Sequence, residues 1–276
     1  MRPSTLARAS LGLIFAATSF APQLVAQRAP QHRIALEQYL DWEEVQAPQF
    51  SPSGAQIAYG RRWIDKMNDK WESSIWISNV DGSRARQLVQ GSDVKWSPDG
   101  TRIAYIARGE PTGQQIFVRW MDAEGATTQI SHLTEAPSNL EWSPDGKSIA
   151  FTSNVPTRET WRIAMPTPPK GAKWTEPPKI VSRLNYRSDR IGFTDEGYRH
   201  VFVLPADGGT ARQITTGDWN HSAADYSADG QWLVFSSYRT PDADGAFRRS
   251  HIYAANLESG DIKPLTSGAG TNNGPM

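Results

Sequence analysis

Residues 96–107 read WSPDGTRIAYIA, and residues 142–153 repeat the pattern as WSPDGKSIAFTS. Looser copies start at Phe50 (FSPSGAQIAYGR) and at Tyr226 (YSADGQWLVFSS). Pro sets φ for the second position of a type I turn, Asp can bond its own backbone, and Gly tolerates the conformation that closes the turn. The β-branched and aromatic residues that follow are typical of a half-buried strand. Each copy therefore predicts a strand, a turn and a second strand.

The glycine at the end of each turn measures the spacing of the repeat. The gaps are 46, 46 and 84 residues, counted between Gly54, Gly100, Gly146 and Gly230. Because 84 is twice 42, we expect a degenerate fifth copy in the last gap, with its turn at 185–192 and its strand at 199–204. A second hairpin is predicted within most units, at 75–88, 116–130, 201–215 and 252–266.

A period of about 40 to 45 residues with four strands is typical of a propeller blade. A β-sandwich also has many short strands, but it has no reason to repeat one tetrapeptide at constant spacing. The predicted fold is therefore all-β, a β-propeller built from four-stranded blades of the WD40-like (PD40, SPDG) type, with about five blades present. Trp96 and Trp142 hold equivalent positions in the repeat and are predicted to lie in the core.

Composition limits the possible functions. The 276 residues include 38% apolar residues, which is enough for an ordinary core. The 29 basic and 29 acidic residues cancel, so nucleic acid is not an expected partner. The chain has no cysteine, which excludes disulfides, thiol chemistry and Cys-based zinc sites. No metal and no cofactor is predicted.

The first residues form a different kind of segment. Arg2 and Arg8 lie before the apolar stretch 11–20, a pattern typical of a secretory signal. The apolar stretch is too short for a spanning helix. We predict a signal peptide over 1–26 with cleavage after Ala26, hence a periplasmic or secreted protein with no membrane span after its removal. Residues 27–45 are predicted as a lead-in segment with one short helix, and 46–276 as the propeller.

Over roughly residues 36–276 the sequence resembles the N-terminal propeller of the prolyl oligopeptidase (S9) family of serine peptidases, which includes dipeptidyl and acylaminoacyl peptidases. The resemblance lies in the FSPSG, WSPDG and YSADG turns and in two stretches, RLNYRSDRIGFTDEGYRHVFVLPADGGTARQITTGD at 183–218 and HIYAANLESGDIKPLT at 251–266. It implies a ring of seven or eight blades that admits peptide substrates through its channel to an α/β-hydrolase domain holding a Ser-Asp-His triad.

That catalytic domain is not expected within these residues. Its nucleophile would sit in a G-x-S-x-G elbow between strand and helix. The nearest match is GKSIA around Ser148, but those residues belong to the turn and strand of a blade. One further period after Gly230 reaches 276, so we expect the ring to be incomplete here, the hydrolase domain to lie outside the chain, and the chain alone to be inactive.

Two other functions stay open. One is a non-enzymatic periplasmic propeller of the TolB type that binds envelope proteins, although a TolB protein carries an α/β domain before its propeller and only about 20 residues separate the predicted cleavage site from FSPSG here. The other is a propeller that binds a small ligand or sugar through loop tips, which follow no fixed spacing.

Several polar groups are candidate site residues, and none is assigned a catalytic, cofactor or metal role. Glu43–Glu44 could hold an ammonium group, but a solvated face of a helix is the favoured interpretation. Pro241–Gly245 lacks most ligands of a calcium loop. Arg61–Arg62 and Arg248–Arg249 are interpreted as surface pairs. No metal-ligand spacing links the five histidines, His32, His132, His200, His221 and His251.

Overall fold

The structure is a computed structural model that describes residues 34–122, 124–157, 166–175, 181, 183–189, 192–194, 196–246 and 248–275. The predicted signal peptide and its cleavage site lie outside these residues. Contacts divide the chain into two units, Met1–Tyr39 and Leu40–Met276. A 3-10 helix, η1 (Leu36–Asp41), lies in the predicted lead-in segment. None of the helices in the described ranges has the length and apolar character needed to cross a bilayer.

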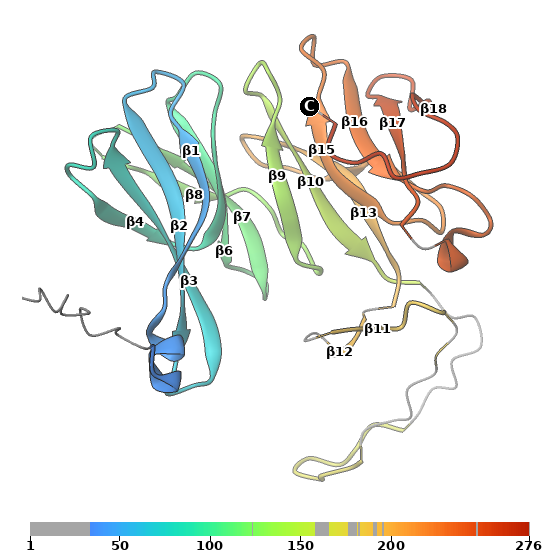
Figure 1. Cartoon of the computed structure of the whole chain (residues 1–276), viewed down its shortest axis with the longest axis horizontal. Coiled ribbons are helices and arrows are strands. Elements are labelled where there is room, and N and C mark those ends of the chain that lie inside the picture. The colour runs from blue at the N-terminus through green and yellow to red at the C-terminus, as the bar shows by residue number, and fades with distance from the viewer. Residues whose placement is uncertain are drawn as a thin grey trace, which may run out of the picture. The chain divides into compact units, whose positions relative to one another are not determined.

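Two four-stranded antiparallel sheets form the N-terminal half of the larger unit (Figure 1). In each sheet the strands pair in chain order, so each sheet is a simple meander. Blade 1 consists of β1 (Glu44–Phe50), β2 (Gln56–Asp65), β3 (Lys70–Asn79) and β4 (Arg86–Gln90). Blade 2 consists of β5 (Ser92–Trp96), β6 (Arg102–Arg108), β7 (Gln114–Trp120) and β8 (Thr127–Gln129).

Two further sheets of the same kind follow. Blade 3 consists of β9 (Pro137–Trp142), β10 (Ser148–Val155), β13 (Tyr198–Pro205) and β14 (Arg212–Gln213). Blade 4 consists of β15 (His221–Tyr226), β16 (Trp232–Ser237), β17 (His251–Asn256) and β18 (Ile262–Pro264), with a short 3-10 helix, η2 (Ala243–Gly245), between β16 and β17. The propeller class predicted from the repeat is therefore confirmed.

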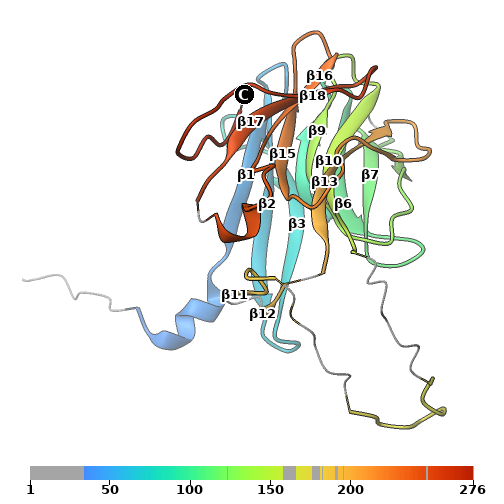
Figure 2. The same cartoon turned by 90° about the vertical axis from the view of Figure 1, so that its right-hand side faces the viewer.

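The prediction of a fifth repeat unit in the last gap is wrong. Its expected turn at 185–192 lies in a connection between β10 and β13, where β11 (Arg187–Ser188) and β12 (Gly192–Phe193) form a separate two-stranded ribbon (Figures 1 and 2). The expected strand at 199–204 exists, but it belongs to β13 and pairs with β10 along the whole length of β10. The described residues thus hold four four-stranded blades, and the 84-residue gap is one blade with a long insertion.

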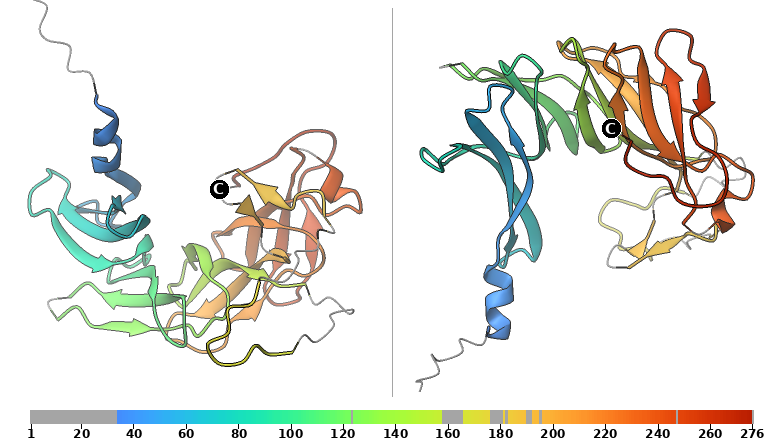
Figure 3. Two further views of the ribbon diagram at one scale, coloured as in Figure 1. Left: turned by 90° about the horizontal axis from the view of Figure 1, so that it is seen from below. Right: turned by 45° about the horizontal axis from the view of Figure 1, so that its top comes forward.

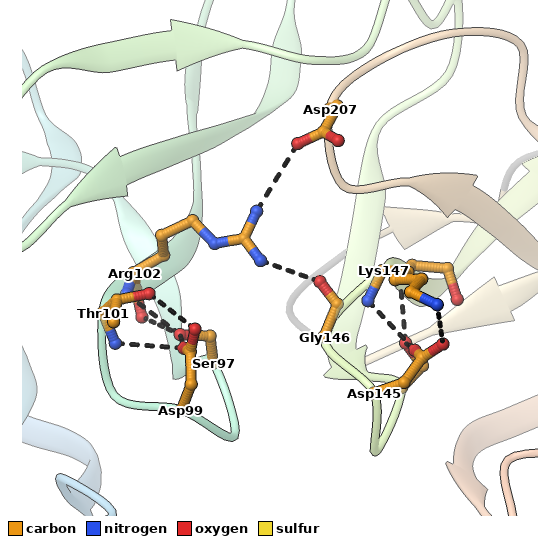
Figure 4. Close-up of polar contacts among 10 residues, drawn as sticks. Ser97, Asp99, Thr101, Arg102, Asp145, Gly146, Lys147 and Asp207 are labelled. Carbon is orange, nitrogen blue, oxygen red and sulfur yellow. Dashed lines mark hydrogen bonds and ion pairs between the residues drawn. The ribbon is translucent and has the colours of Figure 1, made fainter.

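The SPDG turn is held by a compact hydrogen-bond network, seen best in blade 2 (Figure 4). The Gly100 N–H donates to the Ser97 carbonyl at 2.9 Å, and Gly100 has φ +71°, as the turn requires. The Ser97 hydroxyl donates to Asp99 at 2.6 Å and accepts the Arg102 N–H at 2.9 Å. Asp99 also accepts the Thr101 N–H at 3.0 Å. Blades 3 and 4 repeat the Ser–Asp and Ser–backbone bonds at Ser143, Asp145, Ser227 and Asp229.

This network makes the fold sensitive to acid. The hydrogen bond from Ser97, opposed by desolvation and helped by the Thr101 N–H, lowers the pKa of Asp99 to about 2. A lowered folded-state pKa means that the stabilisation is present above pH 4 and is lost as pH falls towards 2. Asp99→Asn is expected to cost about 1 kcal/mol at pH 6, a modest value because Asp99 is exposed.

Urea unfolding of both proteins at pH 6 and pH 2.5 checks this expectation. The difference in free energy of unfolding between wild type and Asp99→Asn should be much smaller at pH 2.5 than at pH 6. An equal gap at both pH values would show that the Asp99 charge does not stabilise the turn.

The core is divided among the interfaces between neighbouring blades. One cluster lies between blades 1 and 2, and includes Ile75, Ile77, Val94 and Ile103. A second lies between blades 2 and 3, and a third between blades 3 and 4. Each blade is pleated, so alternate side chains of one strand enter different interfaces. The repeat therefore buries apolar surface only by placing one blade beside the next.

Arg102 ties blade 2 to blade 3 (Figure 4). Its Nη2 donates to the Gly146 carbonyl at 2.8 Å, and its Nη1 lies 3.5 Å from the Asp207 carboxylate. The guanidinium lies between two indoles, 5.2 Å from the ring centroid of Trp120 and 5.0 Å from that of Trp142. The repeat thus supplies both the turn that Arg102 follows and the turn that it contacts.

Candidate functional site

The first strands of successive blades, β1, β5, β9 and β15, lie next to one another (Figure 3). They are the inner strands of the propeller. The residue before the final aromatic residue of each inner strand is polar and half-buried, and the four equivalents are Gln49, Lys95, Glu141 and Asp225. We call these four residues the inner polar row. The residues on either side of this position in β5 and β9 are buried.

Charge in the inner polar row is unevenly compensated. Lys95 Nζ lies 2.8 Å from Glu141 Oε2, an ion pair between blades 2 and 3. Burial raises the pKa of Asp225, and the Lys95 charge opposes that rise. One ammonium group therefore faces two carboxylates. The row carries a net negative charge when all three groups are ionised.

Each inner strand also has a β-bulge two or three residues before the inner polar row. In three blades the bulge residue has a positive φ, with values of 42° at Ala47, 53° at Asp93 and 57° at Asn139. Asp93 uses its bulge position to accept the Leu140 N–H at 3.0 Å. A small pocket of about 260 Å³ lies beside the bulges of blades 1 and 2. The bulges thus give the inner strands an irregular, partly polar surface.

Glu43 and Glu44 do not lie on a helix, contrary to expectation. Glu44 begins β1, and the pairing of β1 with β2 places it opposite Arg62. Glu43 forms an ion pair with Arg61, and Glu44 lies 3.5 Å from Arg62. The two acidic and two basic residues, considered separately in the sequence, neutralise one another. A cross-strand ion-pair ladder is therefore their observed role.

A larger pocket of about 570 Å³ lies beside the β2–β3 hairpin and is lined by Trp63 among others. Three of the four carboxylates at this pocket have cationic partners: Glu43 pairs with Arg61, Asp41 with Lys66, and Glu72 with Lys70. The fourth, Asp65, accepts hydrogen bonds from Met67 and Asn68. This pocket therefore offers little uncompensated charge to a ligand.

The segment 241–245 has a structural role that the sequence did not suggest. Asp244 lies in η2 and accepts the Leu184 N–H at 2.6 Å, while its carbonyl accepts Asn185 Nδ2 at 3.0 Å. Arg183 Nε lies 3.8 Å from the Asp244 carboxylate. Blade 4 thereby fastens the insertion of blade 3, and the acidic residue of the calcium-like motif is used for that contact.

Three further candidate residues have the following surroundings. The Ser148 hydroxyl lies 3.0 Å from the Tyr226 hydroxyl, between blades 3 and 4, in the expected strand. Tyr238 raises the pKa of exposed Arg249 by a hydrogen bond. His132 is exposed. Within the described part of the chain, no group of three or more His, Cys, Asp or Glu residues is arranged to hold a metal ion.

Two histidines come together across blades, which the spacing did not predict. The rings of His200 in β13 and His221 in β15 lie 5.1 Å apart between centroids. Arg239 Nη1 lies 2.8 Å from His221 Nε2. Neither their spacing in the sequence nor any motif links these three residues, because His200 meets the other two only where blade 4 packs on blade 3.

Three comparisons relate the chain to known proteins. The family model for the dipeptidyl peptidase IV N-terminal region matches residues 169–274. The uncharacterised peptidase YuxL of Bacillus subtilis is 30% identical over 213 residues, which cover 75% of this chain and 31% of YuxL. The chain thus spans about a third of the length of this relative.

Solved structures agree at the level of the fold. An acylaminoacyl peptidase in complex with Z-Gly-Gly-Phe-chloromethyl ketone aligns with a TM-score of 0.61 at 16% identity, over 83% of this chain and 33% of that one. The acylaminoacyl peptidase of Pyrococcus horikoshii aligns with a TM-score of 0.60 at 15% identity, with the same coverage.

Four antiparallel meanders packed side by side around polar inner strands define the chain as a β-propeller protein. The family match and the peptidase relative then identify it more closely. Its sequence is similar to the N-terminal propeller region of peptidases of the prolyl oligopeptidase family.

Proposed function

We propose that these residues form the substrate-gating propeller of an exported serine peptidase that hydrolyses peptides. The observation that carries the proposal is the inner polar row, in which successive blades place Gln49, Lys95, Glu141 and Asp225 at one level of adjacent inner strands. A lining of polar, partly charged side chains suits the passage of an extended peptide, whose backbone needs hydrogen-bond partners at every residue.

Export and catalysis complete the proposal. The stretch 1–26 directs the protein to the periplasm or the exterior, and the Ser-Asp-His triad lies in an α/β-hydrolase domain outside these 276 residues. The propeller selects unfolded peptides because folded proteins are too wide for its channel. The family of the relatives supports this assignment.

A cysteine-labelling experiment tests the gate in the polypeptide encoded by the complete gene. The chain has no cysteine, so Ala223→Cys creates a defined attachment point for a polyethylene glycol maleimide on the inner strand of blade 4, where Ala223 is exposed. The control is Asp207→Cys, whose native side chain is 96% exposed in the β13–β14 turn. Any cysteine elsewhere in that polypeptide is replaced by serine.

The label on the Ala223→Cys variant is expected to lower kcat/KM for a peptide of about 20 residues at least tenfold, equivalent to about 1.4 kcal/mol of the barrier. The same label on the Asp207→Cys variant should leave kcat/KM within about twofold. Equal effects at both positions would refute gating through the inner strands. A complete gene product that neither cleaves peptides nor reacts with a fluorophosphonate would refute the peptidase itself and favour the TolB-type binding module.

A further inference from the structure

Five arginines stack on aromatic rings in the described part of the chain, and four of them also have a carboxylate partner. The four pairs are Arg61 with Glu43, Arg62 with Glu44, Arg102 with Asp207, and Arg183 with Asp244. The fifth is Arg239, and none of the described carboxylates forms an ion pair with it. This contrast within one fold singles out Arg239.

The surroundings of Arg239 hold its guanidinium in place without neutralising it. The ring of Trp219 lies 4.8 Å from the guanidinium carbon, and that of Tyr253 lies 6.0 Å away. Trp219 is itself fixed, because its Nε1 donates to the Thr240 carbonyl at 3.0 Å. The half-buried guanidinium is partly desolvated, and this desolvation lowers the pKa of Arg239.

His221 accepts a hydrogen bond from Arg239 and contributes no charge. Its Nδ1 lies 2.9 Å from the Arg199 carbonyl, which can only accept, so Nδ1 carries the proton. Nε2 then has a free lone pair for the Arg239 Nη1 donor at 2.8 Å. Burial lowers the pKa of His221 to about 4, so the ring is neutral at pH 7. The local charge of this contact is therefore that of Arg239 alone.

The remaining donors of Arg239 are available to a ligand. A guanidinium has five N–H donors, and one Nη1 bond leaves most of them unused. Within the described residues, the bond to His221 is the hydrogen bond that the guanidinium forms, and the Arg239 side chain is half-buried. Burial and then the charge of Arg239 lower the pKa of His200, and the charge of Asp218 partly opposes this shift. Asp218 forms no ion pair with Arg239.

The cluster lies at a useful place in the fold. His221 is the first residue of the inner strand β15, and Arg239 follows the end of β16. The loop that holds Arg239 continues into η2, which fastens the insertion carrying β11 and β12 (Figures 1 and 2). The site is thus at the end of blade 4 from which the longest connections emerge.

We propose that Arg239, flanked by Trp219 and Tyr253, is a binding site for a carboxylate group of a peptide. A planar guanidinium held by a neutral imidazole leaves an edge for bidentate recognition of a carboxylate, which is the partner that the other four stacked arginines have. The aromatic rings supply apolar contact for the residue that bears the carboxylate. This inference concerns binding only and holds whether or not the complete protein is a peptidase.

The test is isothermal titration calorimetry with the 276-residue chain at low ionic strength. The probes are acetyl-Ala-Ala-Phe with a free carboxylate, the same peptide as an amide, and acetyl-Ala-Glu-Phe-amide, which carries its carboxylate on a side chain. At least one carboxylate peptide is expected to bind about tenfold or more tighter than the neutral amide. Tighter binding of acetyl-Ala-Ala-Phe would identify the ligand group as a terminal carboxylate. Tighter binding of acetyl-Ala-Glu-Phe-amide would identify it as an acidic side chain.

Variants assign the preference to Arg239. Arg239→Met should remove the preference, and Arg239→Lys, which keeps the charge and the fold but not the planar fork, should reduce it at least threefold. Arg86→Met, an exposed arginine on β4, is the matched control and should leave the preference intact. Equal binding of acid and amide by wild type, no binding of any probe at 1 mM, or a preference that survives in Arg239→Lys at full size would overturn the proposal.

Discussion

Replacing Trp142 by alanine is expected to lower the free energy of unfolding by about 3–5 kcal/mol. Trp142 is 5% exposed and belongs to the cluster between blades 2 and 3. Its Nε1 donates to the Lys95 carbonyl at 3.1 Å, and the Arg102 guanidinium lies 5.0 Å from its ring centroid. The substitution therefore removes apolar contacts, one hydrogen bond and one side of the Arg102 site. Urea unfolding followed by circular dichroism measures the loss.

Phe50 provides an internal control because it holds the same position in the repeat. It ends the inner strand of blade 1 and is 65% exposed, since none of the strands in the described residues precedes β1 to form a neighbouring blade. Phe50→Ala should cost less than about 1 kcal/mol. A loss for Phe50→Ala as large as that for Trp142→Ala would show that another part of the protein covers Phe50 in solution.

Gly91→Ala is expected to destabilise the chain by about 3 kcal/mol or more, through strain and a backbone clash together. Gly91 connects β4 of blade 1 to β5 of blade 2 and has a φ of +149°. An added Cβ would lie 2.5 Å from the Ile106 carbonyl oxygen and 3.0 Å from a ring carbon of Tyr105. Relief would require the connection at Gly91 to move away from β6 of blade 2.

The matched control is Gly82→Ala. Gly82 has a φ of +81°, but a Cβ there would meet nothing within 4 Å. This variant should lose only about 1–2 kcal/mol, the cost of a left-handed residue that is not glycine. Thermal unfolding of both variants separates conformational strain from the clash. Similar losses of stability in the two variants would show that the contact of Gly91 with β6 does not resist an added methyl group.

The repeat predicted the fold class and most strands, but it could not locate the insertion. The sequence contains four SPDG-type turns and four second hairpins. Each of the four blades holds one turn and one second hairpin. The spacing of 84 residues before Gly230 suggested a lost unit instead. An insertion between β10 and β13 lengthens the gap just as a degenerate blade would, so spacing alone cannot separate them. The equal number of SPDG-type turns and second hairpins, four of each, was the better indication of how many blades the chain has.

The polar contacts were less predictable than the strands. The inner polar row follows from the repeat, because Lys95, Glu141 and Asp225 each precede an aromatic residue at one position. The approach of Arg239 to His221 does not, since it depends on the pairing of β15 with β16 and on the loop that follows β16. Glu44 and Arg62 became partners only once β1 was seen to be a strand. Local patterns predict which strand a residue occupies, while charge pairing requires the register.

The long connection between β10 and β13 has a consequence for how such a protein can change over time. Val155 still pairs with Tyr198 and Ser148 with Pro205, so the full ladder survives a connection that spans 156–197. The entropy lost in closing a loop grows only with the logarithm of its length, about 0.6 kcal/mol for each doubling. Relative to the short turn 109–113 of blade 2, three doublings amount to about 2 kcal/mol. The connection between two strands of a blade can therefore gain dozens of residues at a small cost in free energy. New recognition surfaces can evolve there while the interfaces between blades stay unchanged.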